Sequence, residues 1–132
     1  MPIFFQPAPG TILNCDFRGY IAPEIVKPRQ VVVLWKHKSA AKLVYIVPLS
    51  TTPPLDPDLA FELKRPPLLR PGQDPDTRIW VKCDLVYTVS TERLSMPVNR
   101  KSRRTSAPIN INVSTPDLME IRKLVAKAMR LL

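Results

Sequence analysis

The chain has 132 residues, of which 45% are hydrophobic, and its 20 lysines and arginines outnumber 11 aspartates and glutamates to give a net charge of +9. This length suits one domain over residues 1–132 with a modest core, and the hydrophobic content excludes a disordered chain. The charge favours a polyanionic partner such as nucleic acid, although a basic surface that only aids solubility fits equally well. No apolar run could cross a bilayer, and the proline-broken segment 1–7 is unlike a signal peptide, so we expect a soluble, cytoplasmic protein with no membrane partner.

The first elements form the predicted centre of the fold. Alternating apolar residues predict a strand over residues 11–17, followed by a proline-restrained loop over 20–28 that is long enough to act as a flap. The apolar runs 29–35 and 43–49 are expected to form a hairpin that turns near 39–40. Because both runs are continuously apolar, we expect burial on both faces of the hairpin.

This hairpin predicts a phosphate-sized pocket at one end of the sheet. Arg29 opens the first strand and Ser50 ends the second, so the two residues should face each other in an antiparallel pair. Thr51 and Thr52 follow directly and add two hydroxyls. A guanidinium beside a row of hydroxyls is a suitable environment for a phosphate group.

The middle of the chain is rich in proline. Seven of the 16 prolines lie within a proline-rich excursion over residues 53–75, where only a short strand near 60–63 is expected. Strand character returns over 79–89, and another short strand is expected near 92–94.

The last third of the chain combines a basic segment with a helix. Residues 99–104 contain four basic side chains, which predicts an exposed hairpin tip that contacts phosphates, before a strand over 109–113. These RNA-binding candidates are Arg100, Lys101, Arg103 and Arg104. A C-terminal helix is predicted over 115–131, because Ser114 can cap it and apolar residues recur at helical spacing. Its basic face, which includes Arg122, is expected to be solvated.

Several classes of enzyme lack their parts in this chain. His37 is the only histidine and lies at the turn end of the hairpin, which excludes a Ser-His-Asp triad and a two-histidine ribonuclease. Three glycines leave no glycine-rich phosphate loop. Cys15 and Cys83 lack metal-type spacing and are expected to be buried thiols. We therefore expect neither a metal nor a cofactor.

The remaining candidates suit the cleavage of RNA by its own 2′-hydroxyl. Lys82 and Asp84 are two residues apart in the predicted strand 79–89, so both should project from one face of the sheet. With Arg29 they would supply a base and two cations, and Ser50 and Thr51 would supply donors to the phosphate. The alternative is a structural salt bridge of Asp84 with Lys82 or Arg29.

Short blocks along most of the chain resemble the PemK/MazF family of toxin endoribonucleases. In chain order they are Pro9-Gly10-Thr11-Ile12 with Asp16-Phe17, Glu24 with Lys27-Pro28-Arg29, Val47-Pro48-Leu49-Ser50-Thr51-Thr52, and Lys82-Cys83-Asp84. The resemblance implies a mainly β (α+β) fold, a small, partly open SH3-like β-barrel of the PemK/MazF (CcdB-like) type with a C-terminal helix. It also implies a homodimer, a cognate antitoxin that occludes the RNA groove, and metal-independent cutting of single-stranded RNA.

The resemblance also assigns roles to residues. Arg29, Ser50 and Thr51 match the family's arginine and strand-end hydroxyls, which makes them catalytic candidates. Asp84 matches the acid of an Arg-Cys-Asp segment found in some members, and here Lys82 replaces its arginine.

The loop before Arg29 contains two further candidates and one departure from the family. Glu24 and Lys27 are assigned to RNA binding, whereas Pro23 stands where some relatives carry histidine. Together with Lys82, this departure leaves an alternative open, namely a non-catalytic nucleic-acid- or protein-binding module of the same fold. A toxin that acts on a protein target such as gyrase is disfavoured by the strong positive charge.

Overall fold

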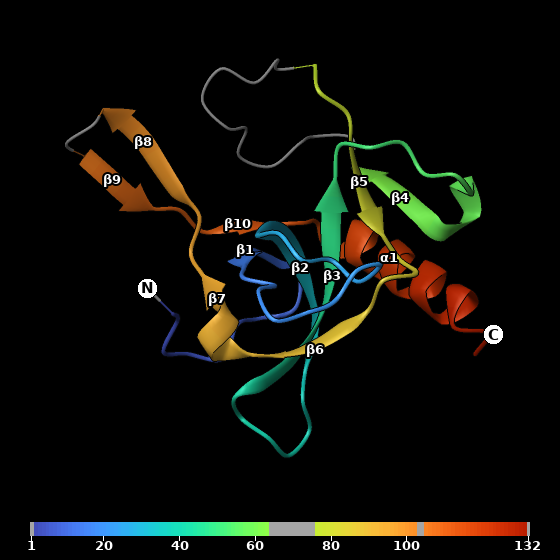
Figure 1. Ribbon diagram of the computed structural model, residues 1–132, viewed down its shortest axis with the longest axis horizontal. Coiled ribbons are helices and arrows are strands. Elements are labelled where there is room, and N and C mark those ends of the chain that lie inside the picture. Colours follow the sequence, from blue (N-terminus) through green and yellow to red (C-terminus); the bar gives the residue numbers. More distant parts are fainter. Residues whose placement is uncertain (1, 64–75, 103–104, 132) are drawn as a thin grey trace.

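The computed structural model describes residues 2–63, 76–102 and 105–131 (Figure 1). Its strands are β1 (Thr11–Cys15), β2 (Arg29–Lys36), β3 (Leu43–Ser50), β4 (Ala60–Leu63), β5 (Ile79–Lys82), β6 (Tyr87–Ser90), β7 (Leu94–Ser95), β8 (Val98–Ser102), β9 (Thr105–Pro108) and β10 (Ile111–Asn112). The helix α1 spans Thr115–Ala128, and short 3-10 helices at Pro57–Leu59 and Thr91–Arg93 precede β4 and β7.

Most strands belong to one antiparallel sheet with the order β10-β1-β2-β3-β5-β4. The long strand β3 has two partners along one of its edges, because its first half pairs with β6 and its last two residues pair with β5. β7 extends the β1 edge, and β8 and β9 form a separate two-stranded ribbon (Figure 1). The sheet curls without closing, so the predicted mainly β, partly open barrel with a C-terminal helix is confirmed.

The hairpin β2–β3 forms as predicted and is the centre of the sheet. Its paired residues include Val32 with Val47 and Val33 with Ile46, and a bulge at Leu34 shifts the register before Trp35. The predicted burial on both faces is confirmed, because the neighbouring residues Val31–Leu34 are all buried although alternate side chains point to opposite faces.

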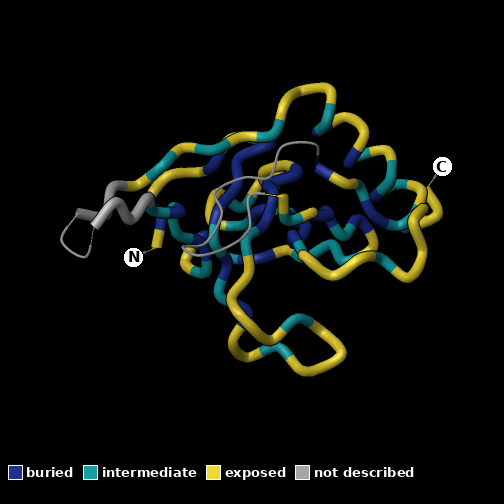
Figure 2. The backbone as a smooth tube through the Cα atoms, turned by 90° about the horizontal axis from the view of Figure 1, so that it is seen from above, coloured by how far each residue is buried: buried dark blue, intermediate teal, exposed yellow. Residues whose placement is uncertain are grey.

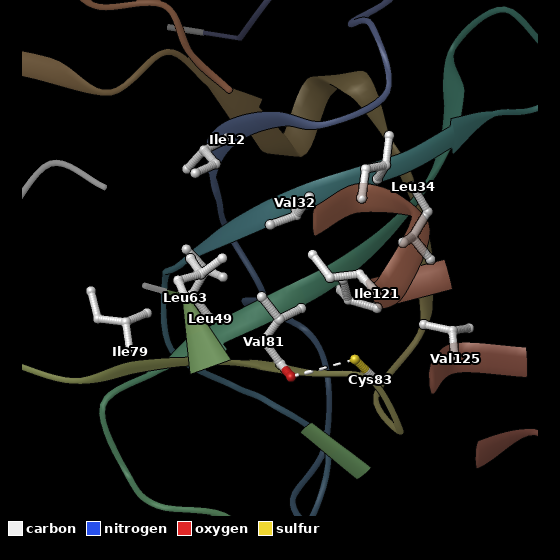
Figure 3. Packing of buried hydrophobic residues seen from close by; sticks show 12 residues of the cluster. Ile12, Val32, Leu34, Leu49, Leu63, Ile79, Val81, Cys83, Ile121 and Val125 are labelled. Atoms are coloured by element: carbon white, nitrogen blue, oxygen red, sulfur yellow. Dashed lines mark hydrogen bonds between the residues drawn. The ribbon is translucent and has the colours of Figure 1, made fainter. Parts of the chain in front are cut away.

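Two hydrophobic clusters cover the two faces of this hairpin. On one face, α1 packs over Val32 and Val81 through Ile121 and Val125 (Figure 3). On the other face, Phe17 is fully buried in a cluster of strand residues that contains Leu13, Val31, Val33, Val44 and Ile46. Figure 2 shows buried residues along the central strands and exposed residues along the loops.

The C-terminal helix begins where the sequence predicts and ends earlier. Ser114 caps it, because its hydroxyl oxygen accepts a 3.2 Å hydrogen bond from the Asp117 N–H. The helix ends at Ala128 and not at residue 131. The expectation of a wholly solvated basic face is wrong for Arg122, which donates to the Leu34 carbonyl and lies over the Trp35 ring. Among the described residues, no helix is long and apolar enough to cross a membrane.

The prediction of one strand over residues 79–89 is wrong. The chain leaves β5 after Lys82, turns at Cys83–Asp84, and pairs with β3 again only from Tyr87. Since β5 pairs with the end of β3 and β6 with its beginning, the two halves follow different parts of the curled strand. The residues on both sides of the turn have strand character, and the polar residues Lys82 and Asp84 are a local sign of the interruption that did not by itself predict a turn.

Smaller differences concern the other short strands. The strand at 60–63 is confirmed, the first strand ends at Cys15 instead of residue 17, and the segment 92–94 is mostly a 3-10 turn before β7. Only Ile111–Asn112 of the predicted strand 109–113 pairs as β10. The predicted basic hairpin is present as β8–β9, with residues 99–102 within β8, and residues 103–104 of its tip lie outside the described residues.

Candidate functional site

The start of β2 and the end of β3 meet at one end of the sheet. Val31 pairs with Pro48 at the last paired step of the ladder between β2 and β3, and Arg29 and Ser50 lie two residues beyond this pair at the ends of their strands. Their direct opposition stays a prediction of the sequence. On its other side, Ser50 pairs with Trp80 of β5. Trp80 is therefore a cross-strand neighbour of Ser50, one strand spacing of roughly 5 Å away, whereas Arg29 starts the strand on the other side of β3.

These side chains share the face of the sheet opposite α1, which we call the site face. Val81 packs in the cluster that contains the helix residues, so its chain neighbours Trp80 and Lys82 point to the opposite face. Ser50 shares that face because it pairs with Trp80. Arg29 shares it because it alternates along β2 with Val31 and Val33, which pack in the cluster away from the helix. The alternation of the strands thus places Arg29, Ser50 and Lys82 on one face of the sheet.

The hydroxyl of Ser50 is oriented by its own backbone. Its Oγ accepts a 3.0 Å hydrogen bond from the N–H of Thr52, in the bend that follows β3. Because this bond occupies a lone pair, the hydroxyl proton remains able to donate to another acceptor. Thr51 lies exposed in the same bend, directly after Ser50.

Asp84 does not lie where the sequence predicts. The strand ends at Lys82, so the alternation that would direct Asp84 to the same face as Lys82 no longer applies. Asp84 lies exposed in the turn after β5, next to the buried Cys83. Its carboxylate is therefore accessible to solvent, two residues along the chain from Lys82.

The structural salt bridge considered as an alternative does not form within the described residues. Three ion pairs are present there, and none of them involves Arg29, Lys82 or Asp84. These three charged side chains therefore have no ionic partner in the described part of the chain.

The flap, residues 20–28, attaches to the site face. The N–H of Ile25 donates a 3.0 Å hydrogen bond to the phenol oxygen of Tyr87, which joins the flap to β6 (Figure 1). Within the flap, the Glu24 carboxylate accepts a 2.8 Å hydrogen bond from the Ile21 N–H. Glu24 and Lys27 are both exposed, and the flap runs directly into Arg29.

An aromatic cluster supports the base of the flap. The rings of Phe17, Tyr20 and Tyr87 contact one another edge to face, with centroids 5.1 to 5.8 Å apart. Arg93 lies over the Tyr20 ring and donates 2.8 Å hydrogen bonds to the carbonyl oxygens of Asp16 and Arg18. The beginning of the flap is therefore tied to the 3-10 turn before β7.

An ion pair between Glu62 and Arg78 lies on the strands next to Ser50. Glu62 of β4 pairs with Trp80, and Arg78 donates two hydrogen bonds to the Glu62 carboxylate, at 2.8 and 2.6 Å. The hydrogen bonds from Arg78 hold the pKa of Glu62 below its ordinary value, and the carboxylate in turn raises the pKa of Arg78. The guanidinium also lies over the Trp80 ring, 4.9 Å from its centroid.

The predicted basic contacts belong to the β8–β9 ribbon or lie outside the described residues. Arg100 and Lys101 belong to β8, in the ribbon that leaves the β10 edge of the sheet, away from the β5–β4 edge. Arg103 and Arg104 lie outside the described residues. The ribbon follows β7, whose Leu94 pairs with Cys15, and Cys15 pairs in turn with Arg29. The contact of these basic residues with RNA stays a prediction.

The two cysteines are structural. Cys15 and Cys83 are free thiols, 1% and 0% exposed, as the sequence predicts. Burial raises the pKa of each thiol to about 12, so neither is a nucleophile at neutral pH. Among the described residues, no group of three histidine, cysteine or acidic side chains is arranged to hold a metal ion.

The sequence analysis missed the residues that support the site. Tyr87 and Arg93 act through contacts with residues more than 60 positions away in the chain, for which a single sequence carries no signal. The ion pair between Glu62 and Arg78 could have been predicted only by pairing the short strand at 60–63 with β5, a partner that the sequence does not indicate.

Comparisons with known proteins agree with this fold. The sequence model of the PemK-like, MazF-like toxins of type II toxin-antitoxin systems matches residues 8–115, which include every candidate site residue. The uncharacterised protein YifN of Escherichia coli (strain K12) is 35% identical over 119 residues, which cover 72% of this chain and 76% of that protein. The Mycobacterium tuberculosis toxin MazF-mt6 has a similar structure, with a TM-score of 0.55 at 13% identity over 93% of this chain and 97% of that one.

Proposed function

This chain belongs to the PemK-like, MazF-like toxins of type II toxin-antitoxin systems, and we propose that it is an endoribonuclease that cleaves single-stranded RNA without a metal ion. Cleavage would proceed by attack of a 2′-hydroxyl on the adjacent phosphate. Membership of the family implies an antitoxin partner. We further propose that the toxin is a cytoplasmic homodimer.

The observation that carries this proposal is the arrangement of Arg29 and Ser50 on adjacent strand ends. Their side chains leave the same face of the sheet, and Lys82 leaves that face from the next strand. Since none of the described ion pairs includes Arg29 or Lys82, both positive charges are available to a bound anion. A phosphate between β2 and β3 would contact a planar guanidinium and a directed hydroxyl.

Each residue has a distinct role in the proposed reaction. Arg29 stabilises the negative charge of the crowded phosphorane, and Ser50 and Thr51 donate hydrogen bonds to its oxygens. Asp84 accepts the proton of the 2′-hydroxyl as the new bond to phosphorus forms. Lys82 protonates the departing 5′-oxygen as its bond to phosphorus breaks, so the products are a 2′,3′-cyclic phosphate and a 5′-hydroxyl.

The basic candidates outside this centre would hold the rest of the RNA. Lys27 contributes positive charge at the end of the flap, and Glu24 stabilises the flap through its hydrogen bond to Ile21. Arg100 and Lys101 extend the contact to the β8–β9 ribbon, and with Arg103 and Arg104 they would bind phosphates without reading bases.

The test is cleavage of single-stranded RNA in EDTA. The purified protein should leave a 2′,3′-cyclic phosphate, and Arg29→Ala should lose this activity while its circular dichroism spectrum and melting temperature stay unchanged, because Arg29 is exposed. Lys127→Ala is the matched control, since it removes one exposed positive charge from the far side of the molecule, on α1. Equal activity of Arg29→Ala and the wild type contradicts the mechanism.

A non-catalytic RNA-binding module is the second candidate function. It is favoured by Asp84, whose carboxylate lies in an exposed turn beyond the strand, and by Lys82, which replaces an arginine of the family segment. Salt-sensitive RNA binding by the wild type without any cleavage would support it. A gain of activity in Lys82→Arg would instead favour the nuclease.

A further inference from the structure

The guanidinium of Arg78 is held in one orientation on the surface. Its Nε and Nη2 atoms donate to the two carboxylate oxygens of Glu62, and its inner face lies against the Trp80 ring. Two parallel hydrogen bonds and a ring contact together fix the plane of the group. The Arg78 side chain is nevertheless 65% exposed, so solvent reaches it on the side away from the ring.

This fixed group lies next to the proposed reaction centre. Trp80 pairs with Ser50 on one side and with Glu62 on the other, so these three residues form one row across the site face. Arg29 lies on the same face, at the start of the strand on the other side of β3. The backbone of Trp80, whose ring supports Arg78, therefore lies one strand spacing, roughly 5 Å, from that of Ser50.

We propose that the outer face of the Arg78 guanidinium is a stacking platform for an RNA base next to the cleaved phosphate, an inference that rests on the RNA substrate proposed above. Bases of single-stranded RNA stack on arginine planes as they do on aromatic rings. Because Glu62 neutralises the charge of Arg78, the group suits stacking better than phosphate binding. Because its orientation is already fixed, stacking requires little loss of side-chain freedom.

A purely structural role accounts poorly for this arrangement. Among the described residues, Arg93 and Arg122 also lie over aromatic rings, and each donates to backbone carbonyl oxygens and so holds separate elements together. Arg78 instead pairs with the half-exposed carboxylate of Glu62, and exposed pairs contribute little to stability. A fixed, flat and exposed group beside Ser50 is better explained by a ligand that lies on it.

The test uses an RNA that the protein can bind and cannot cut. A short oligonucleotide with 2′-O-methyl groups throughout carries the fluorescent base 2-aminopurine, moved one position at a time, and stacking quenches its emission. The wild type should quench the probe at one or two positions. Arg78→Lys keeps the positive charge and loses the planar group, so the quenching should disappear and the affinity should fall about tenfold.

Arg18→Lys is the matched control. Arg18 also forms a two-pronged pair with an exposed carboxylate, that of Asp16, and it lies over no aromatic ring. This variant should therefore quench the probe as the wild type does. Melting temperatures within a few degrees of each other would establish that all three proteins are folded.

The outcomes separate the platform from the nuclease. Quenching that persists in Arg78→Lys, or a bound probe that the wild type never quenches, overturns the platform. If unmodified RNA is still cleaved in that case, the proposed function survives and only the platform fails. If the wild type neither binds the probe nor cleaves RNA, both proposals fail.

Discussion

The phenol oxygen of Tyr87 accepts the backbone N–H of Ile25 across 3.0 Å, and this bond holds the middle of the flap against β6. The Tyr87 ring is half-buried and contacts Phe17 and Tyr20 at the base of the same flap. One side chain therefore contacts the flap at two separate points. Since the flap leads into Arg29, Tyr87 is a positioning residue for the proposed site.

Tyr87→Phe should loosen the flap without unfolding the protein. The change keeps the ring contacts and removes the acceptor of the Ile25 N–H, which should cost about 1 kcal/mol of unfolding free energy. The Ile25 amide should exchange with solvent faster, whereas amides in the centre of β2 should keep their protection. Hydrogen exchange followed by NMR measures both, and an unchanged rate at Ile25 would contradict this role.

A second prediction concerns the contact between α1 and the bulge of β2. Arg122 donates a 2.7 Å hydrogen bond to the carbonyl of Leu34 and lies 4.7 Å from the centroid of the Trp35 ring. Arg122→Ala leaves that carbonyl without its charged donor, so the unfolding free energy in urea should fall by about 1 to 3 kcal/mol.

Lys123→Ala is the control for this change. Lys123 is exposed and forms a 3.7 Å pair with Glu120, so its removal should change the unfolding free energy by less than about 0.5 kcal/mol. Equal effects of the two variants would mean that the contact of Arg122 with the bulge contributes nothing.

The sequence predicted those elements whose signal is local. The apolar runs of the hairpin, the turn between β2 and β3 and the capped start of α1 each follow from neighbouring residues, and the structure has them. The antiparallel register of the hairpin followed as well, with Val31 opposite Pro48, because a hairpin sets its own register.

The positions that depended on long-range pairing were predicted less well. Asp84 was assigned to a strand because its neighbours have strand character, and only the two-part pairing of β3 with β5 and β6 reveals the turn. Arg122 looked solvated because helical spacing placed it among lysines, whereas the bulge at Leu34 that it contacts is a tertiary feature.

The buried cysteines give a third prediction. Burial raises the pKa of Cys15 and of Cys83 from 9.0 to about 12, so both thiols stay protonated and inaccessible in the folded protein at pH 8. Ellman's reagent should therefore detect no fast-reacting thiol in the native state and two in 6 M guanidinium chloride. Because the unfolded thiols lose their protons near 9.0 and the folded ones do not, stability should also fall as the pH rises above that value. A fast-reacting thiol in the folded protein would contradict this burial.

The last prediction concerns the titration of the Glu62 carboxylate at acidic pH. The hydrogen bonds from Arg78 lower the pKa of Glu62 from its ordinary value of 4.5, so the folded protein holds this carboxylate in its charged form more strongly than the unfolded chain does. The pair therefore stabilises the fold at pH values well above 4.5, and this contribution is lost as the pH falls through the lower folded-state pKa. NMR titration of the Glu62 carboxyl carbon should give a midpoint below 4.5.

Asp16 provides an internal reference in the same titration. Its pKa is lowered from 3.8 by hydrogen bonds from Arg18, a pair that shares no residue with Glu62 and Arg78. In Arg78→Lys the titration midpoint of Glu62 should rise toward its ordinary value while that of Asp16 stays the same. The reason is that the substitution removes the paired hydrogen bonds of Arg78 to Glu62 and leaves those of Arg18 to Asp16. If both midpoints move together, the change acts on the whole protein. If neither moves, the fork between Arg78 and Glu62 does not form in solution, and the orientation of the guanidinium beside Ser50 loses its physical basis.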